Sequence, residues 1–342
     1  MRIALFLPVL LAACGDDGDQ PPLSDAITLQ CPTPGNLPFR LDSRGFQRTT
    51  NQALSDRSPR FKDEASDVLG NPDGVVATVY LENAAAPVAG IHYEGLKART
   101  RAEQGLSSDP FPGEAVSLWF HDEDAAAWLM LDRATTDDEG HYDFATGDFL
   151  APNGAPVFAV LEADGSCASH RNFLLPSGSQ FVVMDIDGTL TIDDDQILMQ
   201  VADGTYVPET MIGAAALAQA WDAKGYPIIY LTARDNLFDA ETRTWLDQLA
   251  FPPGAVITAN STAPADVYKT AWLERMIADF GWVPYAAYGN AETDITAYAN
   301  AQIPLDRTFI IGPNAGNGGT VAIPNGDYTE HLTAFVAAQP DN

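Results

Sequence analysis

Basic residues are scarce in this sequence. Only 18 lysines and arginines stand against 47 aspartates and glutamates, which gives a formal net charge of −29. Such an acidic chain repels the phosphate backbone of nucleic acids, so we predict no nucleic-acid partner. The acidity gives no help in docking to an anionic membrane either, and we interpret it as a source of solubility.

Histidine and cysteine are also rare. None of the five histidines pairs with another at metal-ligand spacing, so no histidine metal site is predicted. The three cysteines are Cys14, Cys31 and Cys167. Apolar runs of membrane-spanning length are missing as well. The N-terminal run over residues 3–13 is too short to span a bilayer as a mature helix.

That N-terminal run has the pattern of an export signal. Met1-Arg2 gives it a positive start, and it ends in Leu-Ala-Ala followed by Cys14. This ending resembles the lipobox of bacterial lipoproteins. The resemblance implies a signal peptide over residues 1–13, lipidation of Cys14, and a protein exported and anchored to a bacterial membrane, on a periplasmic or outer-membrane face. An ordinary secretory signal is the alternative. Residues 14–31 are polar and predict a flexible tether.

If Cys14 is lipidated, Cys31 and Cys167 remain as an even pair in an oxidising compartment. We predict a disulfide between them, which would pin the segment after the tether to the end of the first domain. Two buried free thiols are the alternative.

Residues 32–178 predict a β-rich domain. Between residues 75 and 175, short apolar or alternating runs are separated by turn residues, and they indicate a small antiparallel β-sandwich. The expected strands are 75–81, 115–120, 127–131, 141–144 and 156–161. The segment 135–144 resembles a hairpin of transthyretin-like and immunoglobulin-like domains. Its acids could hold calcium, but we favour a solvated turn. Residues 32–74 predict no element.

Residues 179–342 alternate strands and helices, which predicts a parallel sheet with right-handed crossovers. Apolar runs indicate the strands, and apolar residues at helical spacing indicate the helices. Expected strands are 181–184, 226–231, 256–257, 285–288 and 308–311, and expected helices are 208–224, 239–249, 265–280 and 294–301.

The first of these strands, Phe181–Met184, ends in Asp185 and Asp187, and Gly188 lets the chain turn. Ligands of open α/β sheets bind outside the carboxyl ends of the strands. Two acids at such a point repel each other unless a cation or a phosphoryl group lies between them. An acidic turn without function is the other interpretation.

The run from Asp185 to Thr191, D-I-D-G-T-L-T, resembles the first motif of the haloacid dehalogenase-like phosphatases. It is most similar to that of the lipin branch, the phosphatidate phosphatases. The segments 231–234, 286–298 and 307–316 resemble lipin segments too, so the similarity covers about residues 180–320. It implies a haloacid dehalogenase-like, Rossmann-like parallel-sheet domain, preceded by the β-sandwich.

The resemblance also implies the catalytic roles. Asp185 would be the nucleophile that takes the phosphoryl group, and Asp187 the acid and base that serves the leaving group and then water. Thr232 would donate a hydrogen bond to the phosphoryl oxygens, and Lys269 would neutralise their charge. Lys269 could instead be a solvated helix residue, and Lys224 is another lysine of this domain.

The same resemblance implies Mg2+ as the cofactor, held by the carboxylate of Asp185, the backbone carbonyl of Asp187, and Asp294. Asn290 would be a ligand or a partner of a ligand. The acidic run 193–195 could suggest a metal cluster, but we interpret it as a solvated turn, since three consecutive acids cannot all face one ion.

The role of Arg234 remains open at this point. Its side chain could contact substrate, or pair with Asp235 or Asp239.

The lengths of the segments between the motifs indicate what size of substrate the site can take. The segment 191–208 has room for a flap, and 234–269 has room for one helix and one strand, so we predict no large cap. An open site suits a bulky or membrane-embedded phosphoester. With the lipin resemblance, this predicts a Mg2+-dependent phosphatase for phosphatidic acid or a related lipid phosphomonoester at a membrane. A phosphatase for soluble or macromolecular phosphoesters and a non-catalytic phosphatidate-binding module are the alternatives, although the intact Asp185 and Asp187 argue against the latter.

Overall fold

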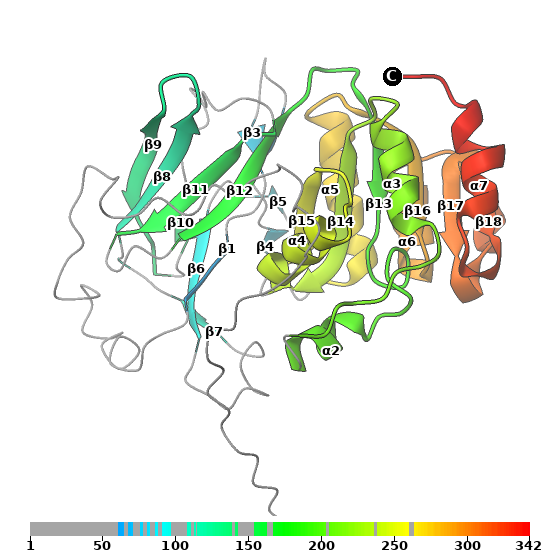
Figure 1. The fold of residues 1–342 in the computed structure, drawn as a ribbon, viewed down its shortest axis with the longest axis horizontal. Coiled ribbons are helices and arrows are strands. Elements are labelled where there is room, and N and C mark those ends of the chain that lie inside the picture. Colours follow the sequence, from blue (N-terminus) through cyan, green and yellow to red (C-terminus); the bar gives the residue numbers. More distant parts are fainter. Residues whose placement is uncertain are drawn as a thin grey trace, which may run out of the picture.

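The computed structural model describes residues 61–64, 68–70, 76–77, 81–82, 86–87, 91–96, 108–110, 113, 115–138, 141–142, 154–162, 167–202, 205–235, 238–259 and 263–342. Figure 1 shows a β-rich part beside an α/β part, with strands β8 to β12 on one side and the larger parallel sheet on the other. The predicted signal peptide, tether, lipidated Cys14 and Cys31 lie outside the described residues. The backbone of Cys167 starts a strand, but its side chain is not described, so the disulfide stays a prediction.

The β-rich part contains a six-stranded sheet in the order β3-β2-β12-β11-β8-β9. Neighbouring strands are antiparallel except β12 and β2, which run parallel. A separate sheet joins β1, β6, β10 and β7, and β4 pairs with β5. The strands are β1 Phe61–Glu64, β2 Val68–Gly70, β3 Val76–Ala77, β4 Leu81–Glu82, β5 Ala86–Pro87, β6 Ile91–Leu96, β7 Ser108–Pro110, β8 Ala115–Asp122, β9 Ala127–Thr135, β10 His141–Tyr142, β11 Pro156–Leu161 and β12 Cys167–Leu174.

The apolar strands of this part agree with the sequence. β8, β9 and β11 lie where strands were expected, and β3 and β4 lie at the two ends of the expected strand 75–81. The expected hairpin over 135–144 is not formed in the described residues, because β10 pairs with β6 in a different sheet from β9. β1 and β2 lie in the stretch where no element was expected.

The predicted parallel sheet is confirmed. Its six strands run in the order β15-β14-β13-β16-β17-β18, and every neighbouring pair is parallel. The chain order reverses between β13 and β16, which is the point where ligands bind in such sheets. The strands are β13 Gln180–Met184, β14 Ile228–Asp235, β15 Ala255–Ala259, β16 Val283–Gly289, β17 Thr308–Ile311 and β18 Val321–Ile323.

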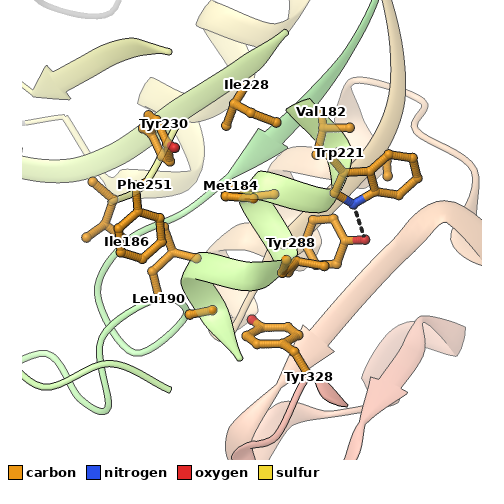
Figure 2. Close-up of a cluster of buried hydrophobic side chains, with 14 of the residues drawn as sticks. Val182, Met184, Ile186, Leu190, Trp221, Ile228, Tyr230, Phe251, Tyr288 and Tyr328 are labelled. Atoms are coloured by element: carbon orange, nitrogen blue, oxygen red, sulfur yellow. Dashed lines mark hydrogen bonds between the residues drawn. The ribbon is translucent and has the colours of Figure 1, made fainter. Parts of the chain in front are cut away.

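Helices cover both faces of this sheet, as expected when strands are apolar on both sides. On one face, Val182 and Met184 pack with Trp221 of α3 (Ala214–Asp222) and Trp245 of α4 (Asp239–Gln248). Figure 2 shows this cluster, in which the Trp221 indole donates to the Tyr288 hydroxyl over 2.8 Å. Helix α7 (Thr329–Ala334) adds to the same face. Short 3-10 turns lie at Leu305–Arg307, Gly312–Asn314, Asn317–Gly319, Pro324–Gly326 and Val336–Ala338.

On the other face, Phe181 and Val183 pack with α5 (Ala265–Ala278) and α6 (Glu292–Asn300). The same core cluster includes Phe173 and Leu175 from the end of the β-rich part, and the Trp282 indole donates to the Leu175 carbonyl over 2.9 Å. The two parts therefore share a core next to the predicted boundary at residues 178 and 179.

The predicted helix 208–224 starts too early. Thr210 forms a β-bridge with Thr191, and Gly213 has a left-handed φ of 79°, so helix α3 begins at Ala214. Among the described residues between Thr191 and α3, the only helix is α2 (Gln196–Ala202), which stands off the sheet in Figure 1. This agrees with a flap in place of a large cap. No helix among the described residues is long and apolar enough to cross a membrane.

Candidate active site

A pocket of about 290 Å³ lies at the carboxyl ends of β13, β14 and β16. Because parallel strands end at one edge of the sheet, side chains that are distant in the sequence meet there. Its charged and amide lining residues are Asp185, Asp187, Asp194, Arg234, Lys269, Asn290 and Asp294. The predicted carboxylates, lysine and asparagine thus share one pocket, together with Arg234 and Asp194.

Asp185, Lys269 and Asp294 form a buried ionic cluster. The Lys269 ammonium lies 2.6 Å from a carboxylate oxygen of Asp185 and 2.6 Å from one of Asp294. The three side chains are at most 6% exposed. Such burial makes each charge depend on the others, because removing one partner of a buried pair leaves an uncompensated charge.

The pKa values in this cluster are shifted. Burial raises the pKa of the Asp185 carboxyl to about 7, the charge of Asp294 adds to the rise, and Lys269 opposes it. Burial alone would lower the pKa of Lys269, but the charges of Asp185 and Asp294 outweigh it and raise that pKa. Lys269 therefore carries its charge, whereas Asp185 exchanges a proton near neutral pH.

Asp187 is held by Arg234. The guanidinium Nη2 lies 2.7 Å from one carboxylate oxygen of Asp187, and Nε lies 2.9 Å from both oxygens. Nη1 donates to the Thr242 hydroxyl over 3.1 Å, and the guanidinium lies 5.6 Å from the Trp245 ring centroid. Asp239, one of the suggested partners, bonds to Arg243 over 2.7 Å.

The turn after β13 fixes the first acids. The Thr189 hydroxyl donates to Asp185 over 3.0 Å, and the Tyr328 hydroxyl donates to the Thr189 carbonyl over 3.0 Å. Gly188 has a φ of 67°, and a Cβ there would overlap the Asn290 side chain. A glycine is therefore needed at this position both for the backbone and for space.

The start of α6 holds the late acid. One oxygen of Asp294 bonds to Lys269, and the other accepts the backbone N–H groups of Asn290 and Ala291 over 2.9 and 3.0 Å. Gly289 makes room, because a Cβ there would press on the Asp294 side chain. Asp294 is fully buried as a result.

Two residues, Thr232 and Asp194, differ from expectation. Thr232 is fully buried and is not among the pocket-lining residues. Its hydroxyl accepts the backbone N–H of Arg234 over 3.1 Å and donates to Asp187 over 3.5 Å. Asp194, expected in a solvated turn, lines the pocket. Burial and then the charge of Asp187 raise its pKa, while a hydrogen bond with Asn290 opposes the rise. Lys224 is directed to the C-terminus, where it donates to the Gln339 carbonyl over 2.7 Å.

The pocket has the right chemistry for a hard cation. Its four carboxylates and two cationic side chains leave a formal excess of two negative charges. Mg2+ prefers oxygen ligands and keeps several waters, so it needs few protein carboxylates. In the described residues, no three His, Cys, Asp or Glu side chains already form a metal cluster, since Lys269 and Arg234 occupy the carboxylates. The charge and the oxygen donors of the pocket are therefore of the kind that suits a hard cation.

Fold and pocket define an α/β domain of the haloacid dehalogenase-like class, with its acidic site at the switch point of the sheet. More particularly, residues 182–312 match the family model of the LNS2 domain of the PITM 1-3 proteins. The pocket lies within this matched range, which includes every predicted catalytic and metal-binding residue.

Several curated proteins are similar to this chain. Protein retinal degeneration B of Drosophila melanogaster is 30% identical over 205 residues, which cover 58% of this chain and 16% of that protein. Membrane-associated phosphatidylinositol transfer protein 3 of Mus musculus is 26% identical over 231 residues, covering 66% of this chain and 23% of that protein. The chain therefore spans less than a quarter of the length of these relatives.

Proposed function

We propose that this protein is a Mg2+-dependent phosphatase that hydrolyses phosphatidic acid or a related lipid phosphomonoester through an aspartyl-phosphate intermediate. The observation that carries the proposal is the position of Asp185. It directly follows strand β13, lines the pocket, and has one carboxylate oxygen on Lys269 and the other on Thr189. A carboxylate fixed in this way is oriented for attack on a phosphoryl group.

The chain's own residues supply each part of the reaction. Asp185 forms a bond to phosphorus while the bond to the leaving alkoxide breaks, and Asp187 gives the alkoxide its proton. Asp187 then takes a proton from the water that attacks the acyl phosphate, which releases inorganic phosphate and restores the Asp185 carboxylate. Lys269 keeps its positive charge beside the reacting oxygen.

Mg2+ would be held by the Asp185 carboxylate, the Asp187 backbone carbonyl and Asp294, with Asn290 beside them. When bound, it neutralises charge on the phosphoryl oxygens. The excess of negative charge in the pocket supports this role, because a phosphate dianion would otherwise be repelled.

A lipid substrate is supported by the open pocket and by its surroundings. The flap carries large apolar side chains that are exposed to solvent: Ile192, Leu198, Met199 and Val207 are 39 to 54% exposed. Ile197, which lies on helix α2 with Leu198 and Met199, lines the pocket. Some relatives are membrane-associated phosphatidylinositol transfer proteins by name, which favours a membrane partner. A lipidated Cys14 would hold the enzyme at that membrane.

A non-catalytic phosphatidate-binding module is the second candidate. The observation that favours it is the two-pronged Arg234–Asp187 pair, in which the guanidinium donates to both carboxylate oxygens that a leaving group or a water would have to reach.

Phosphate release from phosphatidate in mixed micelles tests the proposal. With Mg2+, the rate should follow the surface concentration of phosphatidate at fixed bulk concentration, and kcat/KM should exceed that for glycerol 3-phosphate by orders of magnitude. Asp185→Asn should lose more than about 1,000-fold in rate, as expected for a lost nucleophile.

Comparable rates on the two substrates would overturn the lipid assignment and favour a soluble phosphoester. Phosphatidate binding without phosphate release would instead select the binding module.

A further inference from the structure

Arg234 is the cationic pocket residue to which the proposed chemistry assigns no role. We propose that Arg234 is a positioning residue, which holds the Asp187 carboxylate in the orientation needed for proton transfer to the leaving group. The inference rests on the proposed function, and it assigns the Arg234 side chain no direct contact with the substrate.

The guanidinium of Arg234 is itself immobile. Its side chain is 1% exposed, Nη1 is bonded to the fully buried Thr242, and the fully buried Trp245 ring lies against it. Thr242 and Trp245 both belong to α4, so the helix that follows β14 in the chain sets the position of the guanidinium. A buried arginine with such partners has little freedom to swing toward a ligand.

The nitrogens of Arg234 are also already in use. Nε and Nη2 bond to Asp187, and Nη1 bonds to Thr242. A phosphate in the pocket would have to break the contact with Asp187 to reach Nε. This favours an action of Arg234 through Asp187 over direct binding of the phosphoryl group.

Asp187 needs such support more than Asp185 does. Its side chain is 20% exposed, and within the described part of the chain its other side-chain hydrogen bond is a long one, from the Thr232 hydroxyl over 3.5 Å. Contacts of a guanidinium with both oxygens fix the plane of a carboxylate, which a single contact does not. Arg234 therefore determines where the proton on Asp187 can be delivered.

The experiment is a double-mutant cycle with two substrates. Asp187→Asn, Arg234→Gln and the double variant are assayed on phosphatidate and on p-nitrophenyl phosphate, whose leaving group departs without a proton. We expect Arg234→Gln to lower kcat on phosphatidate by about 100-fold, within the range of lost general-acid catalysis, and to leave KM nearly unchanged. The loss on p-nitrophenyl phosphate should be much smaller. The double variant should be no slower than Asp187→Asn alone.

Two further variants separate positioning from stability. Thr242→Val removes the Nη1 anchor and should give a smaller loss with the same preference for p-nitrophenyl phosphate, so the test survives if Arg234→Gln does not fold. Arg243→Gln is the matched control, because Arg243 lies on the same helix and pairs with Asp239 outside the pocket. It should leave both activities unchanged.

Additive losses in the cycle, equal losses on the two substrates, or a loss confined to KM would overturn the positioning role while the phosphatase assignment stands. Absence of phosphate release from the unaltered protein would overturn the proposed function, and the positioning role with it.

Discussion

Two ionic groupings face the same pocket and are built from the same kinds of residue, yet they differ in burial and in charge balance. Asp185 and Asp294 share one lysine in a cluster that is at most 6% exposed. Asp187 has an arginine of its own and is 20% exposed. The Asp185–Lys269–Asp294 cluster therefore buries one carboxylate charge that no cation balances. The Asp187–Arg234 pair is balanced in charge, and its carboxylate is partly exposed.

This difference in burial and charge balance suits the carboxylates of Asp185 and Asp187 to different chemical roles. Burial raises the pKa of the Asp185 carboxyl to about 7, so its charged form is stabilised most when a cation or a phosphoryl group lies beside it. Asp185 therefore suits the nucleophile position. A carboxylate held in one plane at the open side suits contact with the leaving group and with water, which is the role proposed for Asp187. The following predictions disturb one grouping and leave the other intact.

The largest effect should come from removing the shared cation. Lys269→Met leaves two buried carboxylates without their cationic partner, which typically costs about 3 to 5 kcal/mol. Chemical denaturation at pH 8 measures the free energy of unfolding. Lys224→Met is the matched control, because Lys224 bonds to one carbonyl and to Asp341, which is 84% exposed, and it should cost only about 1 kcal/mol. Equal costs would show that the buried cluster has no special dependence on its lysine.

The second effect is a pH dependence of stability. The pKa of Asp185 is about 7 in the folded protein against an ordinary value of 3.8, so the folded state holds the proton more tightly. Its contribution to stability is present below pH 4 and is lost as the pH rises through 7, with a slope of up to about 1.4 kcal/mol per pH unit.

Asp185→Asn should remove this slope. The free energies of unfolding of the two proteins, measured without divalent cations from pH 4 to 8, should therefore diverge in favour of the variant. Parallel curves would mean that Asp185 is not shifted.

The third and smallest effect concerns the Mg2+ requirement. Asp294→Asn keeps the shape and an acceptor for the Asn290 and Ala291 N–H groups but removes one negative charge. We expect the Mg2+ concentration for half-maximal activity to rise by about 10- to 100-fold, with most of the maximal rate recovered at high Mg2+. An unchanged Mg2+ requirement would remove Asp294 from the metal site.

Much of the fold could be predicted because local pattern and tertiary structure agree there. The apolar run 181–184 could only be a buried strand, and β17 lies at the predicted residues 308–311. The meeting of Asp185, Lys269 and Asp294 follows from parallel strands that end at one edge. The family resemblance supplied the order of these residues along the chain.

The failures have physical causes. Helix α3 starts late because a bridge between Thr191 and Thr210 and the left-handed Gly213 override the helical spacing of residues 208–213. Strand β12 has the polar sequence CASHRNFL, which gives no apolar run to detect. The partner of Arg234 lies 47 residues away in the turn after another strand, and no local pattern reports such a pairing.

The proposed role of Asp185 is tested most directly by trapping the phosphoenzyme. Protein mixed with phosphatidate and Mg2+ is quenched in acid during turnover, digested, and analysed by peptide mass spectrometry. We predict that the peptide containing Asp185 gains the mass of one phosphoryl group in the unaltered protein, gains more of it in Asp187→Asn, and gains none in Asp185→Asn. Phosphate release with no phosphoryl group on that peptide in either of the first two proteins would contradict the nucleophilic role of Asp185.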